Sequence, residues 1–238
     1  MDLKNKNAII TGASRGIGKA IALALAAEGC NVALVSRSET ELNKVCAEAK
    51  TLGVQALAIA LDMEKMSNLE QVVDKTLAIF TKIDILINNA GYCVPAEFLE
   101  VSEEQYDKHF FINLKAPFFL TQYALNAMKG NGEGHIINIS STAALEIPAF
   151  HSAYGASKLG LVGFSKALYQ TCKEYNIKVS VVYPHFTDTQ MLRDIDPHVA
   201  PDKWMSTGDI ADTVLFLLKS SNKMIIKEIV PIAFQTER

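Results

Sequence analysis

The amino-acid sequence predicts an α/β protein with a doubly wound, mostly parallel seven-stranded sheet and helices on both faces. Three observations predict it: apolar runs of strand length recur along the chain, segments with helical spacing separate them, and the runs are apolar throughout rather than alternating. Such strands are typical of a parallel sheet that crossover helices cover on both sides. The 238 residues contain no repeat or linker that divides them, so we expect a single domain over residues 1–238.

The first elements carry the clearest boundary signals. A strand over 8–11 runs into a glycine-rich turn, which opens a helix over 16–28. A second strand covers 32–35, and the helix that follows it covers 39–50. Ser38 and Glu41 stand in the spacing of a capping box, in which each side chain satisfies a free backbone amide at the helix start.

The same alternation continues to the end of the chain. The remaining strands are expected at 56–61, 83–87, 135–139, 179–183 and 225–232, and the remaining helices at 69–81, 102–129, 154–175 and 208–218. One long irregular stretch interrupts the pattern, at about 185–206. Structureless segments of this length in compact domains often close over ligands, so we expect a substrate lid there.

Composition excludes several classes of protein. The net charge is −3, which leaves no excess of Lys and Arg to neutralise a nucleic-acid backbone. The apolar run at 20–27 is far shorter than the roughly 20 residues of a membrane span, and residues 1–7 lack the features of a signal peptide. We therefore expect a cytoplasmic protein without a nucleic-acid or membrane partner. The four cysteines are far apart and predict reduced thiols rather than a metal site.

The glycine-rich turn predicts a binding site for a phosphate-bearing ligand. The segment TGASRGIG at 11–18 follows a strand and opens a helix, where backbone amides and the helix dipole favour an anion. Gly12 permits a tight turn, Gly16 allows close approach of a pyrophosphate, and Gly18 lets the helix pack on the sheet. Glycine triplets also occur in purely structural turns, but the strand–turn–helix placement favours a dinucleotide site that includes Ser14, Arg15 and Ile17.

The end of the second strand indicates which dinucleotide binds. NAD-dependent proteins usually have an acidic residue there, which accepts hydrogen bonds from the ribose 2′-hydroxyl. This chain has Arg37, whose guanidinium would pair with a 2′-phosphate, and Arg15 could add a second positive charge. Glu39 lies at about the right distance along the sequence for an acidic residue that binds the ribose, but its place in the capping box gives it a structural role. We therefore expect NADP(H).

Tyr154 and Lys158 are one helical turn apart, so they share a helix face. A cation roughly 4 Å from a phenol, at an effective dielectric near 20, contributes about 4 kcal/mol. That free energy corresponds to roughly three pKa units, enough to bring a tyrosine toward neutral pH. The same spacing is common on ordinary amphipathic helices, so a catalytic interpretation of the pair depends on its context, that is, on the other motifs in the sequence.

That context resembles the short-chain dehydrogenase/reductase family over nearly the whole chain, which implies a Rossmann fold. The matching pieces stand in the expected order: TGASRGIG at 11–18, Asp62, Asn88-Asn89-Ala90-Gly91, Asn113, Ser141, Tyr154-Gly-Ala-Ser-Lys158 and Pro184. The resemblance implies that Tyr154 gives a proton to a carbonyl oxygen and that Ser141 holds the same oxygen. Lys158 would lower the tyrosine pKa and bind the nicotinamide ribose, and Asn113 would hold a water that relays protons.

The resemblance also implies further cofactor contacts. Asp62 would bind the adenine amino group, although an Asp after a strand can also be a turn former. The remaining residues expected at the cofactor are Asn88, Ala90, Gly91, Pro184, Thr187 and Thr189, besides Tyr154 and Lys158. Where the family usually has Pro-Gly, this chain has Pro184-His185, a change that could narrow the pocket or alter the backbone.

For the substrate side we expect Cys93, His151 and His185 to line the cleft, with Cys93 as a wall rather than a nucleophile. No histidine belongs to a recognisable metal-ligand pattern, and no metal is expected. The family's subunits commonly pair through the helices at 102–129 and 154–175, so we expect a homodimer or homotetramer.

The overall expectation is an NADP(H)-dependent ketone or aldehyde reductase acting on a small molecule. One alternative is reduction of 3-oxoacyl groups on acyl carrier protein. Members that dock this acidic carrier have arginines at the places of Gly132 and Tyr175, and the segment 187–209 of this chain is rich in Asp. An alternative of another class is a non-catalytic NADP(H) sensor, against which the retained Ser141, Tyr154 and Lys158 argue.

Overall fold

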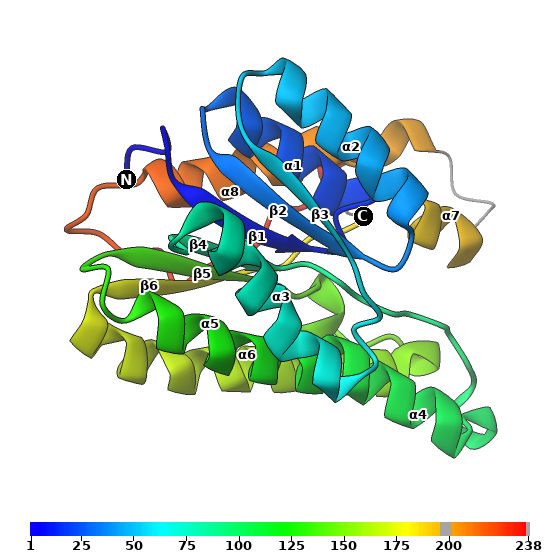
Figure 1. The fold of residues 1–238 in the computed structure, drawn as a ribbon. Coiled ribbons are helices and arrows are strands. Elements are labelled where there is room, and N and C mark those ends of the chain that lie inside the picture. The colour runs from blue at the N-terminus through cyan, green and yellow to red at the C-terminus, as the bar shows by residue number, and fades with distance from the viewer. Residues whose placement is uncertain (196–200, 237–238) are drawn as a thin grey trace.

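The computed structural model describes residues 1–195 and 201–236 and contains one seven-stranded sheet (Figure 1). The strand order is β3-β2-β1-β4-β5-β6-β7, and every neighbouring pair is parallel. The expected doubly wound α/β fold is confirmed. The strands are β1 (Asn7–Thr11), β2 (Asn31–Ser36), β3 (Ala56–Ala60), β4 (Ile85–Asn88), β5 (Gly134–Ile139), β6 (Ile177–Val182) and β7 (Glu228–Ile229).

Helices cover both faces of this sheet, and Figure 1 shows them as two layers with the sheet between them. One layer contains α1 (Gly16–Ala27), α2 (Glu39–Thr51) and α8 (Thr207–Lys219). The other contains α3 (Met66–Phe80), α5 (Ala116–Met128) and α6 (Ser152–Cys172), with α4 (Glu103–Phe110) leading into α5. A short helix, α7 (Gln190–Ile195), lies between β6 and α8.

The strands are apolar throughout because the side chains on each face of the sheet pack against one of the two helix layers. In β1, Ala8 and Ile10 belong to the core under α1, α2 and α8, whereas Ile9 belongs to the core under α3, α5 and α6. All three side chains are fully buried. Successive side chains of a strand point to opposite faces, so a strand covered on both sides must be apolar at every position.

The structure corrects several predicted boundaries. The helix expected over 102–129 is two helices joined by a π-helical segment, Phe111–Lys115. The strand expected over 225–232 is reduced to Glu228–Ile229. The stretch at 185–206 is not structureless, because it contains α7 and a 3₁₀ turn at Pro201–Lys203. At the start of α2, Ser38 accepts from the Glu41 amide, but Glu41 pairs with Lys44 instead of closing a capping box.

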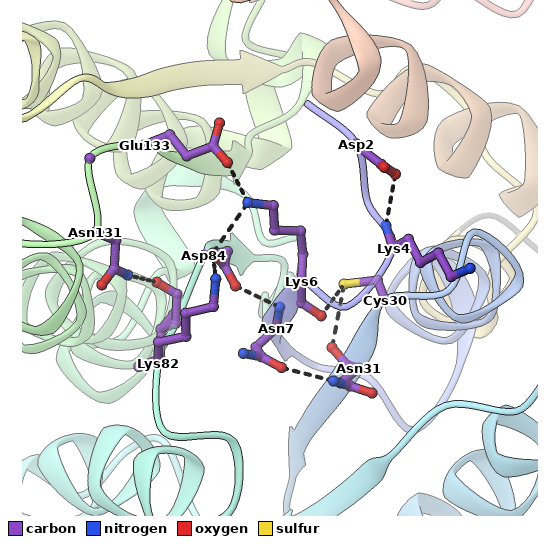
Figure 2. Close-up of polar contacts among 12 residues, drawn as sticks. Asp2, Lys4, Lys6, Asn7, Cys30, Asn31, Lys82, Asp84, Asn131 and Glu133 are labelled. Carbon is purple, nitrogen blue, oxygen red and sulfur yellow. Dashed lines mark hydrogen bonds and ion pairs between the residues drawn. The ribbon is translucent and has the colours of Figure 1, made fainter.

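A polar cluster fastens the amino ends of the strands (Figure 2). Asp84 is 1% exposed, accepts hydrogen bonds from the Asn7 amide and Lys82 Nζ, both at 2.9 Å, and forms an ion pair with Lys6. Lys6 also pairs with Glu133, just before β5. A buried carboxylate is stable only when such partners compensate for its lost hydration. The cluster thus joins the beginnings of β1, β4 and β5 and leaves the carboxyl ends of the strands for ligand binding.

Candidate active site

A large cleft of about 1820 Å³ runs along the carboxyl ends of the strands. Its lining begins in the turn after β1, continues past the ends of β2, β3 and β4, and reaches residues that follow β5 and β6. In open parallel sheets, ligands bind outside the carboxyl ends of the strands, where the strand order reverses. A volume above the 300–1,000 Å³ typical of one small ligand leaves room for a dinucleotide and a substrate together.

The glycine turn forms one end of the cleft. Gly12 and Gly16 have φ values of +66° and +57°, a region that side chains disfavour. A Cβ on Gly12 would lie 2.9 Å from Asn89 Nδ2, so a larger residue would displace the floor of the cleft. Helix α1 begins without a side-chain cap or an acidic residue in its first turn, which leaves its positive end available to an anion. Ser14, Arg15 and Ile17 also line this end.

Gly18 has the packing role that was expected of it. It does not line the cleft, and a Cβ there would lie 2.3 Å from the Gly12 carbonyl oxygen. The absent side chain lets α1 approach the turn after β1. Gly18 therefore shapes the site without forming its surface.

The polar groups beyond β2 and β3 suit the adenosine half of a dinucleotide. Arg37 lines the cleft with 71% of its side chain exposed and has only a loose ion pair to Glu64, at 3.8 Å. Ser36 Oγ is buried and has no hydrogen-bond partner among the described residues, so it can serve a ligand. Asp62 lines the cleft and also accepts the Glu64 amide hydrogen bond, which means that it is a turn former as well.

The segment after β4 contributes differently from what was expected. Asn88 is 3% exposed and donates to Thr121 Oγ1 and Asn138 Oδ1 inside the protein, away from the cleft. The residues that line the cleft are Asn89, Ala90 and Gly91. Asn89 was not among the expected ligands, although its place within the Asn-Asn-Ala-Gly motif was a usable signal. Strand alternation explains the difference, because adjacent residues face opposite ways.

Tyr154, Ser141 and Lys158 meet in the middle of the cleft and are all part of its lining. Ser141 follows β5, and its Oγ accepts from the Ala143 amide at 3.1 Å. Ser140 is buried and donates to the Lys158 carbonyl, so the two neighbouring serines have different surroundings. Lys158 Nζ donates to the Ile139 carbonyl at 2.8 Å and lies 6.0 Å from the centre of the Tyr154 ring.

This geometry reverses the expected electrostatics of the pair. Burial raises the pKa of Tyr154, and the nearby Cys93 acts in the same direction, whereas the Ser141 hydroxyl lowers it. Burial also lowers the pKa of Lys158 to about 8. The ammonium is held by a backbone carbonyl, and desolvation is the largest cause of the pKa shift in both groups. Tyr154 is therefore protonated at neutral pH, the form that can donate a proton.

Asn113 lies in the π-helical segment and is completely buried. Its amide oxygen accepts from the Tyr92 amide at 2.8 Å, and its nitrogen donates to the Tyr92 carbonyl and to Ser157 Oγ. The side chain thus clamps the segment that carries Cys93. Both amide hydrogens are engaged and the amide oxygen keeps one acceptor site, so the water expected at Asn113 stays a prediction.

Two histidines pack around Tyr154, with ring centres 6.3 Å (His109) and 5.8 Å (His151) from its own. His109 is buried, and its Nε2 accepts from the Val94 amide. Burial lowers the pKa of both imidazoles, which keeps them neutral. His151 lines the cleft as expected, whereas His109 supports the segment behind it.

The other expected residues of the substrate side also lie on the cleft. Cys93 lines it, and burial raises the pKa of its thiol to about 12, which supports its role as a wall. His185 lines it without a left-handed backbone, so the replacement of glycine causes no strain at this position. Its ring packs on Phe186 at 4.3 Å.

The segment from β6 to α7 contains the last of the residues expected at the cofactor. Pro184, Thr187 and Thr189 all line the cleft, and Thr189 Oγ1 also accepts from the Leu192 amide at the start of α7. Residues 196–200 of the expected lid lie outside the described residues.

Sequence reasoning missed the apolar wall of the cleft. Its residues come from three separate segments: Leu145, Ile147 and Phe150 between β5 and α6; Phe186, Met191, Leu192 and Ile195 at α7; Val230 and Ile232 after β7. The only signal in the sequence was the mainly apolar segment 145–150, which also contains Glu146, because the other two segments reach the cleft through the fold alone.

Two features are absent from residues 1–195 and 201–236. In that part of the chain, no group of three or more His, Cys, Asp or Glu side chains could hold a metal ion. Among the same residues, no helix has the length and apolar character needed to cross a membrane.

One family model matches most of the chain: it is described as short chain dehydrogenase and covers residues 6–200. The 3-oxoacyl-(acyl-carrier-protein) reductase FabG of Escherichia coli (strain K12) is 33% identical over 236 residues, which cover 96% of each protein.

Two solved structures show the same similarity in three dimensions. A metagenomic short-chain oxidoreductase in complex with NADP has a TM-score of 0.83 and 32% identity, and the match covers 97% of both chains. A 7α-hydroxysteroid dehydrogenase complexed with NADH and 7-oxo glycochenodeoxycholic acid has a TM-score of 0.90 and 28% identity, covering 97% of this chain and 94% of that one. The two carry different cofactors, so the similarity supports a nicotinamide dinucleotide of either kind.

Proposed function

Because the chain belongs to the short-chain dehydrogenase family, we propose that it is an NADP(H)-dependent ketone or aldehyde reductase. It would transfer a hydride between the nicotinamide and a carbonyl or secondary alcohol. The observation that carries the proposal is the meeting of Tyr154, Ser141 and Lys158 midway along a cleft whose one end is an uncapped glycine turn. A non-catalytic sensor would need the turn but not these three side chains.

Each residue has a role that its geometry supports. When bound, the cofactor supplies the hydride, and with it the two electrons that reduce the carbonyl carbon. Tyr154 donates its phenolic proton to the carbonyl oxygen, so that an alcohol results. Ser141 Oγ donates a hydrogen bond to the same oxygen and stabilises the developing negative charge. Lys158, with its pKa lowered to about 8, can pass a proton toward Tyr154 after each turnover.

The residues at the adenosine end support NADP(H) over NAD(H). Arg37 and Arg15 are the two cations among the described lining residues at this end, and both can approach a 2′-phosphate. Glu39 does not line the cleft, so it offers no ribose-binding acid there. Glu41 and Glu64 do line it, and Glu64 forms the loose ion pair with Arg37 that a phosphate would replace.

The decisive experiment removes the proton donor alone. Tyr154→Phe should keep NADPH binding, measured by fluorescence titration, and lose turnover of a panel of ketones and aldehydes by on the order of 10²- to 10⁴-fold. Ser141→Ala should lower turnover through the lost hydrogen bond. Tyr106→Phe, a partly exposed tyrosine on α4, is the matched control and should turn over normally. Wild-type turnover in Tyr154→Phe would disprove the mechanism.

The similarity to FabG favours a second candidate, reduction of 3-oxoacyl groups on acyl carrier protein. Gly132 and Tyr175 stand at the places where carrier-binding members have arginines, which argues against it. A comparison of 3-oxoacyl carrier protein with a short 3-oxoacyl thioester as substrates distinguishes the two candidate functions. A large preference for the carrier-bound form would establish the second candidate.

A further inference from the structure

The two ends of the cleft differ in charge. The end near the glycine turn contains Arg15 and Arg37 among its described lining residues, together with the acidic side chains Glu41, Asp62 and Glu64. On the other side of Tyr154 the described lining contains one charged group besides Lys158, the carboxylate of Glu146. We call this second part the apolar arm.

Exposed hydrophobic side chains form most of the apolar arm. Seven large apolar residues in it are between 36% and 52% exposed: Leu145, Ile147, Phe150, Phe186, Met191, Val230 and Ile232. They belong to three segments that are far apart in sequence but line one cleft. Contiguous apolar surface is unfavourable in water, and on a soluble domain it usually marks a binding site. A ligand that covered these side chains would gain the corresponding hydrophobic free energy.

Besides Lys158 and the imidazoles of His151 and His185, the described residues of the arm include no group that could neutralise an anion. Arg193, on α7, is engaged by Asp188 through two hydrogen bonds of 2.7 and 2.9 Å and does not line the cleft. His151 lines the arm as a neutral imidazole, because burial lowers its pKa. A carboxylate or phosphate in this arm would lose hydration and face Glu146 without a compensating cation.

From this charge pattern we propose that the substrate is an uncharged ketone, or the matching secondary alcohol, with an extended apolar chain or ring beside the reacting carbon. Carbonyl compounds that carry a carboxylate or phosphate on that side are discriminated against. The inference rests on the proposed function for the reaction itself. It adds which class of carbonyl compound the site selects.

The test uses 4-oxo carboxylic acids and their methyl esters, which differ in charge and by one methyl group, with alkyl chains of increasing length. We expect the ester to have a kcat/KM at least about tenfold higher than the acid. Each added methylene should raise kcat/KM by up to about fourfold until the arm is filled. Equal kcat/KM values for acid and ester, or no rise with chain length, would overturn the inference while leaving the proposed function intact.

A charge-introducing variant examines the arm directly. Met191→Lys places a cation on α7 within the arm and should raise the acid-to-ester ratio of kcat/KM by about tenfold or more. Met224→Lys, at a similarly exposed methionine outside the cleft, should leave that ratio unchanged. An unchanged ratio in Met191→Lys would mean that the substrate does not occupy the arm.

A binding measurement tests the inference without depending on turnover. If the enzyme binds NADPH but reduces none of the compounds, the proposed function fails. The same acid and ester pairs are then titrated into the NADPH complex with nicotinamide fluorescence as the readout. Tighter binding of the longer esters supports the apolar arm, and equal or tighter binding of the acids contradicts it.

Discussion

At the scale of single residues, Arg37 has few competing contacts. Its ion pair with Glu64 is long and largely exposed, and such pairs contribute about 0–1 kcal/mol. A 2′-phosphate carries more charge and offers several acceptor oxygens, so it should displace Glu64 readily.

Arg37→Asp should therefore weaken NADPH binding by about tenfold or more and change NADH binding far less. Titration of both cofactors into the wild type and the variant measures the effect. Lys108→Asp is a suitable control, because Lys108 also pairs with Glu64 but lies outside the cleft lining. Equal affinity of the wild type for NADPH and NADH would count against the role of Arg37.

His135 makes the stability of the fold depend on pH. It is 1% exposed on β5, bonded to Ser180 Oγ at 2.9 Å, and its Nδ1 has no partner among the described residues. Burial lowers its pKa to about 3, with Lys178 and the N-terminal ammonium acting in the same direction. In the unfolded chain the pKa returns to about 6.5.

Between about pH 6.5 and 3, His135 is therefore protonated in the unfolded state and neutral in the folded state. The stabilisation is complete above pH 6.5 and is lost as the pH falls toward 3, by about 1.4 kcal/mol per pH unit. Urea unfolding at several pH values should show that the free energy of unfolding falls more steeply with decreasing pH in the wild type than in His135→Gln. The difference in slope should correspond to the uptake of about one proton on unfolding. Parallel pH dependences would show that His135 titrates normally in the folded state.

At the scale of elements, the turn between β1 and α1 illustrates how closely the backbone packs. A Cβ at position 18 would meet a backbone carbonyl, which cannot rotate away as a flexible side chain can. Overpacking of this kind usually costs about 1–3 kcal/mol.

Gly18→Ala should lower the free energy of unfolding by about that amount and weaken NADPH binding, because α1 and the turn must separate. Gly130→Ala is the control, since a Cβ there meets nothing within 4 Å and the backbone is not left-handed. Its stability should stay close to that of the wild type in urea unfolding. Equal stabilities of the two variants would mean that α1 shifts without cost.

At the scale of the whole molecule, α5 and α6 expose apolar side chains on the surface away from the sheet. Phe118 is 41% exposed and Leu159 is 49% exposed, and Phe118 packs on Phe164 across the two helices at 4.7 Å. An isologous interface would cover this surface in two subunits at once.

We expect a homodimer or homotetramer, and Phe118→Glu combined with Leu159→Glu should reduce the mass measured by light scattering. Ile79→Glu, on the exposed side of α3, should leave the mass unchanged. A wild-type protein that is monomeric at micromolar concentration would refute this expectation.

The sequence by itself determined the seven strands, most of the helices, the glycine turn and the Tyr154–Lys158 spacing. These features are local: a strand buried on both faces is apolar in every residue, a turn with positive φ at Gly12 favours glycine, and a four-residue spacing sets a shared helix face. The same local rules also predicted the helix starts at Gly16 and Glu39, where the structure has them.

Only the tertiary structure decided which of those residues meet. Packing gave Asn88 its partners Thr121 and Asn138 inside the protein, and it placed the Lys158 ammonium on the Ile139 carbonyl. The apolar arm joins segments around Ile147, Met191 and Val230 that no periodicity connects. Contacts between distant segments depend on how the whole chain packs, and burial then sets the pKa values, so neither could be derived from local pattern.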